Sequence, residues 1–478
     1  MKAILLLSGL GVLALFAELF KFRKALFVLI ILGLLGTIAA AVSYWWYDDG
    51  EYAKYFGGML DFQGSSVVTS VIMLGTTLLW FIMSGNYLRK ETAETDHTAL
   101  ILFSLVGALI LTCYTNLVML FLGIEILSIP LYVLAGSRKG EAASNEAAFK
   151  YFLLGAFASG FLLFGIALLF GATGTFDGAA MGDYIIAHKD NLPGFFYGGV
   201  IMVLVGMLFK ISAAPFHFWA PDVYQGSPTV FTAFMSTVVK TAAIVAILRL
   251  FHTKMLGGVS DFWIPVLAIC VGLTFVVGNL SAAVQTSVKR MLAFSSISHA
   301  GFLLLAIVAA SAFTPKSIIY YTIAYSVASI LAFTVLISVI RATGSDDVEG
   351  FNGLGKKNPL LAVVMSISLL SLAGIPPTAG FFAKYYVLTA ALSSGHYWLA
   401  VIGILGSLVG VYYYFKIIIA MYFKEGKEGK EGMEYTADAQ HQALLFVTAV
   451  TTIVIGLLPD LILNIQAPAT TVAQTLPQ

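Results

Sequence analysis

Apolar residues form long runs along this chain, and short polar breaks separate them. Each run is close to the roughly 20 residues that an α-helix needs to cross a bilayer. We expect fourteen spans, at residues 3–20, 25–43, 64–84, 98–113, 115–135, 146–171, 195–219, 228–251, 262–284, 290–311, 316–341, 358–394, 397–422 and 441–465. The pattern predicts an all-α polytopic membrane protein with about fourteen transmembrane helices.

The first of these runs lies where a signal peptide would lie. Only Lys2 precedes it, and a basic segment at residues 21–24 leads directly into the second run. A cleaved signal peptide has a more basic start and is followed by a cleavage site. We therefore expect an uncleaved membrane anchor.

Composition supports the membrane assignment and excludes several functions. The chain is 59% hydrophobic and 11% charged, whereas soluble domains carry about 25% charged residues. No stretch outside the runs is long enough for a soluble catalytic domain, and a net charge of +1 argues against a nucleic-acid partner. The cysteines, Cys113 and Cys270, form no C-x-x-C pair, so neither an iron–sulfur cluster nor a structural zinc is expected.

Basic residues in the loops predict the orientation. With the N-terminus outside, the inner loops hold most of the loop lysines and arginines, including residues 21–24 and 289–290. Loops on the cytoplasmic side carry an excess of Lys and Arg. Both termini are therefore expected on the outer side.

Charged residues inside the expected spans are the candidates for function. They are Glu125, Lys150, Lys210, Lys240, Lys384 and Lys416. A charge at the bilayer centre costs roughly 2.5–3.5 kcal/mol on insertion scales, so such residues face the interior of the helix bundle and mark ion pathways. Glu125 and Lys240 lie at mid-span, although a hydrogen-bonded core carboxylate is an alternative for Glu125. Lys150 and Lys416 lie close enough to the inner surface to reach it; we favour that interpretation for Lys416 and leave both open for Lys150.

Two of the expected spans are interrupted by proline. Pro215 has no N–H for the carbonyl of Ile211 and crowds it, with Lys210 before the break and His217 after it. An ordinary proline kink is the alternative. The run at 358–394 is too long for one straight span, and Pro376-Pro377 interrupts it ahead of Lys384.

The two broken spans suggest an internal repeat. They are five spans apart and run in opposite directions across the membrane, which is typical of inverted-repeat transporters with a site at the midplane. We expect N-terminal helices at 1–97, one five-helix repeat at 98–251, an inverted repeat at 262–422 and a last helix at 441–465.

This arrangement of charges suits proton transfer. Loss of water disfavours the charged form of a lysine, and a neighbouring glutamate favours it. Making or breaking a Glu125–lysine contact would therefore change proton affinity. Opened helices admit water between the titrating groups. His299 lies mid-span and either joins the two halves or is a hydrogen-bonded packing histidine.

These residues resemble the antiporter-like subunits of respiratory complex I, which are related to subunits of multisubunit sodium/proton antiporters. The motif on which this resemblance rests is Lys-x₄-Pro-Phe-His-x-Trp at residues 210–219. Segments 220–228, 285–299 and 374–384 resemble the subunit N branch of that family. The resemblance covers essentially the whole chain.

The resemblance implies a role for each buried charge. Glu125 and Lys210 match the glutamate–lysine pair, and Lys150 matches a lysine near that pair. Lys240 matches the connecting lysine, and Lys384 matches the outlet residue. A lysine at the outlet and the short end after the last span fit subunit N better than subunits M or L.

The resemblance also implies partners and a location. NADH-to-quinone electron transfer in other subunits would drive proton translocation through this chain, in a bacterial inner membrane. FMN, iron–sulfur clusters and quinone are expected in partner subunits and none of them in this chain; its neighbours would be subunit M and the small K- and J-type subunits. The alternatives are a subunit of an Mrp-type cation/proton antiporter and a purely structural spacer.

Overall fold

The computed structural model describes residues 2–46, 54–62, 64–91, 93–425 and 439–465. Within these residues, twelve helices are long and apolar enough to cross a membrane. Two further apolar helices, α1 (Lys2–Phe16) and α17 (Pro359–Ala373), are shorter. The chain is an all-helical polytopic membrane protein, as the sequence predicts, apart from one small β-hairpin.

The described residues form two compact units. Unit 1 holds the residues up to Ile211 together with Val238–Leu267. Its elements are α1, α2 (Arg23–Trp46), β1 (Lys54–Tyr55), β2 (Leu60–Asp61), α3 (Ser65–Leu88), α4 (Glu94–Cys113), α5 (Leu117–Ala135), α6 (Ala142–Thr173), α7 (Gly178–Ala187), η1 (Lys189–Asn191), α8 (Gly194–Ile211), α11 (Lys240–His252), α12 (Lys254–Gly257) and the start of α13 (Ser260–Ala283). The strands pair antiparallel, with Tyr55 opposite Leu60.

Unit 2 holds Ser212–Thr237 and Ala268–Ile465. Its elements are α9 (Trp219–Gly226), α10 (Thr229–Phe234), most of the π-helical turn η2 (Met235–Val239), the rest of α13, α14 (Val288–Ala309), α15 (Thr314–Thr343), η3 (Val348–Phe351), α16 (Leu354–Lys357), α17, α18 (Ala379–Ser393), α19 (Tyr397–Phe423), α20 (Ala439–Leu457) and α21 (Asp460–Leu463).

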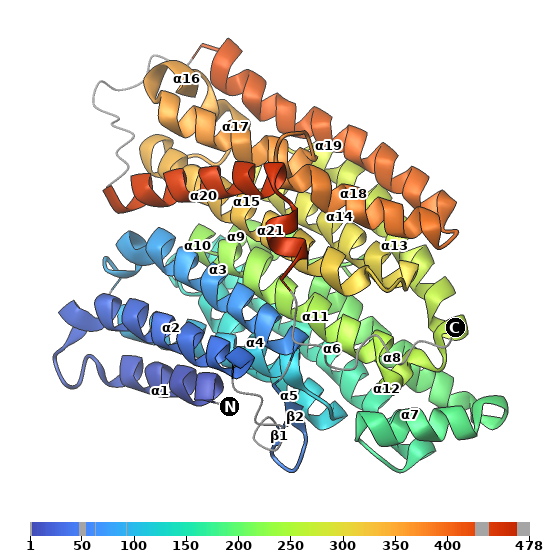
Figure 1. The fold of residues 1–478 in the computed structure, drawn as a ribbon. Coiled ribbons are helices and arrows are strands. Elements are labelled where there is room, and N and C mark those ends of the chain that lie inside the picture. Colours follow the sequence, from blue (N-terminus) through green and yellow to red (C-terminus); the bar gives the residue numbers. More distant parts are fainter. Residues whose placement is uncertain (1, 47–53, 63, 92, 426–438, 466–478) are drawn as a thin grey trace. The chain divides into compact units, whose positions relative to one another are not determined.

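Small residues let the helices of unit 1 approach closely. Helix α4 packs along α5, and α6 packs along α8 (Figure 1). A Cβ on Gly107 of α4 would overlap the backbone nitrogen of Leu127 in α5. A Cβ on Gly165 of α6 would lie 2.8 Å from the carbonyl oxygen of Gly199 in α8. Close backbone packing of this kind is typical of membrane helices, and it places the polar residues of α5, α6 and α8 near one another.

Two helices form the centre of unit 2. In the most apolar 18-residue stretch of each helix, 100% of the α14 residues and 83% of the α15 residues are buried. Helices α17, α18 and α20 pack against α15. A Cβ on Gly456 of α20 would overlap the carbonyl oxygen of Pro377, so α20 packs tightly against the link between α17 and α18.

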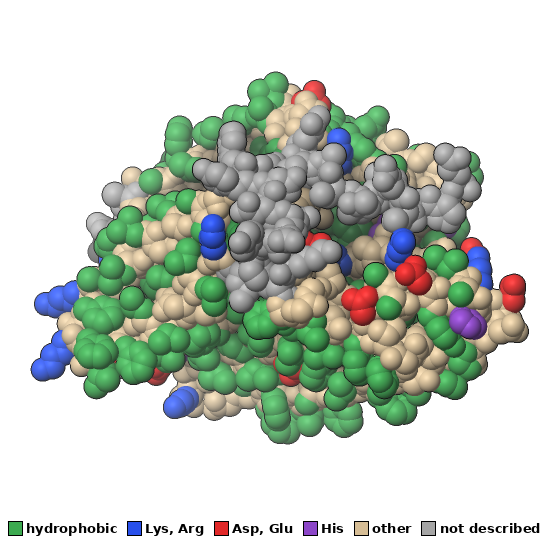
Figure 2. All heavy atoms as spheres, turned by 60° about the horizontal axis from the view of Figure 1, so that its bottom comes forward, with side chains coloured by type: hydrophobic (Ala, Val, Ile, Leu, Met, Phe, Trp, Pro, Cys, Tyr) green, Lys and Arg blue, Asp and Glu red, His purple; other side chains and the backbone are tan. Residues whose placement is uncertain are grey.

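The outer surface carries apolar side chains. Figure 2 shows large apolar areas with few charged side chains between them. On α6 the rings of Phe149 and Phe157 are about two-thirds exposed, at 65% and 64%. Extended apolar patches are rare on soluble monomers, and exposed rings such as these suit contact with lipid or with neighbouring membrane helices.

Both predicted proline interruptions are confirmed, with different ends from those expected. Helix α8 ends at Ile211, four residues before Pro215, because Ser212 takes a left-handed conformation with φ 63°. The long run at 358–394 forms α17 and α18, with Pro376-Pro377 between them. The helix thus ends earlier than the missing N–H of Pro215 alone predicts, since the left-handed conformation of Ser212 ends it.

Candidate functional site

A glutamate and a lysine lie on neighbouring helices of unit 1. Glu125 is half-buried in the middle of α5, which begins after Asn116, whose side chain accepts a hydrogen bond from the N–H of Val118. Lys210 is buried in the last turn of α8. It comes immediately before the residues at which the helix breaks.

Serine hydroxyls contact both charged groups. Lys210 Nζ donates to Ser128 Oγ, and Ser128 lies one turn after Glu125 on the same face of α5. Ser159 of α6 donates its hydroxyl to Glu125 Oε1. Among the described residues, neither Glu125 nor Lys210 forms an ion pair within 4.0 Å. Glu125 and Lys210 are therefore each hydrogen-bonded to a serine, and the serine that Lys210 contacts lies one helical turn from Glu125 on α5.

A small cavity lies beside these groups. It has a volume of about 10 Å³ and is lined by Ile124, Ser128, Tyr132, Gly155, Ala158, Ser159, Leu162, Gly206, Phe209 and Lys210. This volume is about that of one water molecule. A Cβ on Gly155 would overlap the Tyr132 hydroxyl oxygen, so the Tyr132 side chain would have to move. The cavity provides room for a water that would contact the lysine and both serines.

An aromatic ring stabilises the lysine from another direction. Lys210 Nζ lies 5.7 Å from the ring centroid of Tyr151 on α6. Within about 6 Å, an ammonium group is attracted to the face of an aromatic ring. The Tyr151 ring packs edge-on against Tyr132, with centroids 4.7 Å apart.

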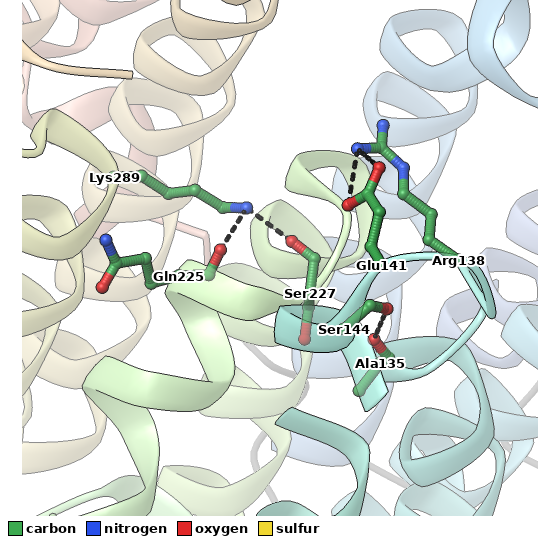
Figure 3. Close-up of polar contacts among 7 residues, drawn as sticks. All are labelled: Ala135, Arg138, Glu141, Ser144, Gln225, Ser227 and Lys289. Carbon is green, nitrogen blue, oxygen red and sulfur yellow. Dashed lines mark hydrogen bonds and ion pairs between the residues drawn. The ribbon is translucent and has the colours of Figure 1, made fainter. Parts of the chain in front are cut away.

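The connection between α5 and α6 sets the register of these groups. Ser144 Oγ donates to the carbonyl oxygen of Ala135 at 2.7 Å, and Arg138 Nη1 pairs with Glu141 Oε1 at 3.2 Å (Figure 3). The Ser144 bond ties the first turn of α6 to the last turn of α5. It therefore helps to hold Ser159 against α5.

Lys150 lies nearer the start of α6. Its Nζ is 2.7 Å from Glu146 Oε1, and the two side chains are 37% and 63% exposed. Nine residues separate Lys150 from Ser159, or about 14 Å along a helix. The structure thus places Lys150 at a half-exposed ion pair, on the same helix as the serine that contacts Glu125.

Lys240 is buried in unit 1 as the first residue of α11. The π-helical turn η2 comes immediately before it. Turns of this type are frequent at functional sites within helices. The helix over Thr229–His252 is therefore irregular at its predicted functional lysine.

His217 lies in unit 2, in the segment between the end of α8 and α9. Its side chain is buried, and its ring lies 4.6 Å from the ring of Phe218. The freed backbone of this segment has an internal partner, since the Ala214 N–H donates to Thr274 Oγ1 at 2.9 Å. Broken membrane helices need such partners for their backbone groups.

Lys384 binds the end of the helix before the second break. Gly374 has φ 84°, and the N–H groups of Gly374 and Ile375 bond to Ser371 and Leu370 carbonyls in a Schellman arrangement. Lys384 Nζ donates at 2.8 Å to the carbonyl oxygen at position 373, the last of α17. A cation there also complements the negative end of the helix dipole.

His299 is held by two phenol groups in unit 2. Its Nδ1 lies 2.7 Å from the Tyr321 hydroxyl of α15, and its Nε2 lies 3.3 Å from the Tyr414 hydroxyl of α19. Tyr414 also bonds to Ser295, one turn before His299 on α14. His299 is thus hydrogen-bonded, as the packing alternative required, and these two bonds go to hydroxyl groups, which can both donate and accept a proton.

Two basic residues bind backbone carbonyls near the ends of helices in unit 2. Lys416 Nζ donates to the Gln285 carbonyl oxygen, just after α13, at 2.9 Å. Lys289, expected in an exposed loop, is buried and donates to the carbonyl oxygens of Gln225 and Ser227 at the end of α9 (Figure 3). These contacts are consistent with structural roles.

Sequence reasoning missed the hydroxyl groups of the site. They are Ser128, Ser159, Ser295, Tyr321 and Tyr414. A signal was available for two of them, because Ser128 and Ser295 lie one turn from Glu125 and His299. Ser159, Tyr321 and Tyr414 reach the site only through helix packing. Among the described residues, no three His, Cys, Asp or Glu side chains are placed to hold a metal ion.

Comparison with known proteins identifies the family. Residues 115–410 match the family described as NADH:quinone oxidoreductase/Mrp antiporter, transmembrane. A protein of Cytophaga hutchinsonii, named NADH-quinone oxidoreductase subunit N, is 43% identical over 467 residues, which are 97% of this chain and 99% of that protein.

Solved structures agree. A chain of respiratory complex I from Thermus thermophilus has 32% identity and a TM-score of 0.79, covering 97% of this chain and 98% of that one. A chain of the Mrp complex from Dietzia sp. has 22% identity and a TM-score of 0.81, covering 96% and 95%, and that likeness is one of fold. The family model matches more than half of the chain, and the named relative matches nearly all of it. The chain therefore belongs to the NADH:quinone oxidoreductase/Mrp antiporter family of membrane proteins.

Proposed function

We propose that this chain is a proton-translocating membrane subunit of an NADH:quinone oxidoreductase. Its likeness to proteins named subunit N supports this over nearly its whole length. The structural observation that carries the proposal is the pair of Glu125 and Lys210, each bonded to a serine beside a water-sized cavity, directly before a broken helix. The pair suits a group that gains and loses a proton.

The proposed proton path uses the buried charged and imidazole groups. They are Glu125, Lys150, Lys210, His217, Lys240, His299 and Lys384. The helix interruptions near Pro215 and at Pro376-Pro377 would admit water between these groups. Each group would hold a proton in turn, and a change in the Glu125–Lys210 contact would alter the proton affinity of both.

We further propose the inverted-repeat organisation that the sequence suggests. One repeat comprises residues 98–251 and the other 262–422, with helices at 1–97 and 441–465 outside them. A count of fourteen crossings takes α1 as one crossing and the broken pair α17–α18 as another. Both termini would lie on the outer side of a bacterial inner membrane.

The redox groups would belong to other chains. FMN, iron–sulfur clusters and quinone would be bound by partner subunits, and none by this one. The proposed neighbours are the antiporter-like subunit M and the small K- and J-type membrane subunits. The exposed apolar rings of α6 suit packing against helices of this kind.

The first experiment is gentle detergent extraction of the tagged chain, followed by a native gel stained for NADH dehydrogenase activity. We expect co-migration with a large NADH-oxidising assembly. Sodium- or potassium-dependent proton exchange in vesicles without NADH, by a smaller assembly, would instead indicate an Mrp-type antiporter.

Site variants then test the mechanism in vesicles that oxidise NADH. Lys210→Ala and Glu125→Ala should abolish most proton uptake while the complex still assembles. Lys416→Ala is a matched control, because that lysine binds a backbone carbonyl just past the end of α13. Full coupled activity in the first two variants would refute the assigned roles.

A further inference from the structure

The polar groups around His299 connect three helices of unit 2. Ser295 and His299 lie on α14, Tyr321 lies on α15 and Tyr414 lies on α19. All four side chains are buried. Tyr414 hydrogen-bonds to Ser295 and to His299 Nε2, and Tyr321 hydrogen-bonds to His299 Nδ1. The order along the chain of bonds is serine, tyrosine, histidine, tyrosine.

This order has a chemical consequence. A neutral imidazole has one N–H donor and one bare nitrogen acceptor, and a hydroxyl group can both donate and accept. The four groups can therefore be bonded in either of two directions. In one, Tyr414 donates to Nε2 and Nδ1–H donates to Tyr321. In the other, Tyr321 donates to Nδ1 and Nε2–H donates to Tyr414.

A second tyrosine of α15 has a hydroxyl with a structural partner. Tyr320 is buried and comes directly before Tyr321 in the chain. Its hydroxyl donates to the carbonyl oxygen of Ile455 in α20 at 2.9 Å. A backbone carbonyl has no proton to pass on, so this hydroxyl serves a structural bond.

One end of the His299 chain lies near another buried base. Phe302 contacts both Tyr321, with ring centroids 6.1 Å apart, and Lys384, whose Nζ is 5.2 Å from the Phe302 centroid. A single aromatic ring therefore lies beside both Tyr321 and Lys384. A proton that reaches Tyr321 has a base in its neighbourhood.

We propose that Ser295, Tyr414, His299 and Tyr321 form a proton relay within unit 2, in which Tyr414 passes the proton between Ser295 and His299. This inference rests on the proposed function and extends it to two tyrosines and a serine. It gives His299 a role that a packing histidine does not have.

The transfer balances at every atom. A protonated water gives a proton to Ser295 as Ser295 gives its own to the Tyr414 oxygen, and a neutral water is left. Tyr414 gives its hydroxyl proton to Nε2, and Nδ1 gives its proton to the Tyr321 oxygen, whose own proton leaves toward the neutral amine of Lys384, which becomes an ammonium group. Every O–H or N–H bond formed matches one broken, and one proton passes. Rotation of the hydroxyls and exchange of the imidazole proton from Nε2 to Nδ1 through water restore the starting direction.

The test compares three Tyr→Phe variants of the assembled complex in sealed vesicles. Tyr414→Phe and Tyr321→Phe each remove one relay hydroxyl, and Tyr320→Phe removes a buried hydroxyl that bonds a backbone carbonyl outside the relay. The rate of NADH-driven proton uptake is measured, and a native gel gives the amount of complex. General acid–base groups contribute roughly 10²–10⁴-fold, and a substituting water recovers part of that. We expect a loss of about tenfold or more for the two relay variants and none for Tyr320→Phe.

Each outcome decides between two claims. Normal pumping by Tyr414→Phe, with Lys210→Ala inactive in the same vesicles, would overturn the relay and leave the proposed function intact. Equal losses in all three Tyr→Phe variants would also overturn it, because the effect would then be one of packing. Normal pumping by Lys210→Ala would contradict the proposed function itself.

Discussion

The hydroxyl of Ser128 offers the sharpest test of the site in unit 1. Ser128→Ala removes the acceptor of the hydrogen bond from buried Lys210 and leaves the fold of α5 intact. A hydrogen bond to a charged group contributes about 1.5–3 kcal/mol, which corresponds to roughly 10- to 150-fold in rate if the charged lysine is needed in the limiting step. The adjoining cavity of about 10 Å³ would grow by the lost oxygen, and a water there could accept the bond from Lys210 in its place. We therefore expect a loss near the lower limit, about tenfold.

The assay is NADH-driven proton uptake by inverted membrane vesicles, normalised to the amount of assembled complex. Ser128→Thr is the matched control, since it keeps a hydroxyl at the same position and should retain most activity. If Ser128→Ala pumps as fast as the parent, the Lys210 bond to Ser128 does not support proton transfer. If Ser128→Thr fails equally, the effect comes from packing against α8.

Three further variants test other parts of the structure. Gly380→Ala would place a Cβ in overlap with the Ser371 carbonyl oxygen. Overpacking costs about 1–3 kcal/mol or more, so less of the complex should remain assembled after heating. Gly160→Ala is the control and should be neutral, because the space around Gly160 is open. Lys384→Arg keeps a cation for the last carbonyl of α17 but cannot release a proton, so assembly on a native gel should be normal while proton uptake is lost; normal uptake would remove Lys384 from the path. Lys150→Met removes an exposed helical ion pair worth about 0.3–0.5 kcal/mol, so stability should hardly change, and a several-fold fall in uptake is expected; unchanged uptake would leave Lys150 a surface residue.

Local features of the sequence were enough to predict the helices, their interruptions and the charged groups. A long apolar run demands a helix in a bilayer, a proline lacks an N–H, and a charge inside such a run is costly wherever it lies. None of these arguments depends on which helix is the neighbour. Glu125 and Lys210 therefore stand out as functional candidates from the sequence alone.

Features that depend on neighbouring helices could not be predicted. Serine is common in membrane helices, so nothing local distinguishes Ser159, whose contact with Glu125 arises from the packing of α5 on α6. Lys289 resembles an exposed loop lysine in the sequence, and only the tertiary structure shows that it donates to the Gln225 carbonyl oxygen at the end of α9. Helix α8 ends at Ile211 because Ser212 takes a left-handed conformation, and no local rule places such a conformation at a serine.

The order of segments along the chain has a consequence for biosynthesis. Unit 1 is interrupted in the sequence, because Ser212–Thr237 belong to unit 2 and Val238–Leu267 return to unit 1. Helix α11, which carries Lys240 and packs against α4 and α8, is therefore translated after the first segment of unit 2. Domains fold as their residues emerge from the ribosome. The helices of unit 1 that precede residue 212 therefore cannot complete their packing until α11 has been synthesised and inserted. A nascent chain stalled before residue 238 would lack a completed unit of either kind.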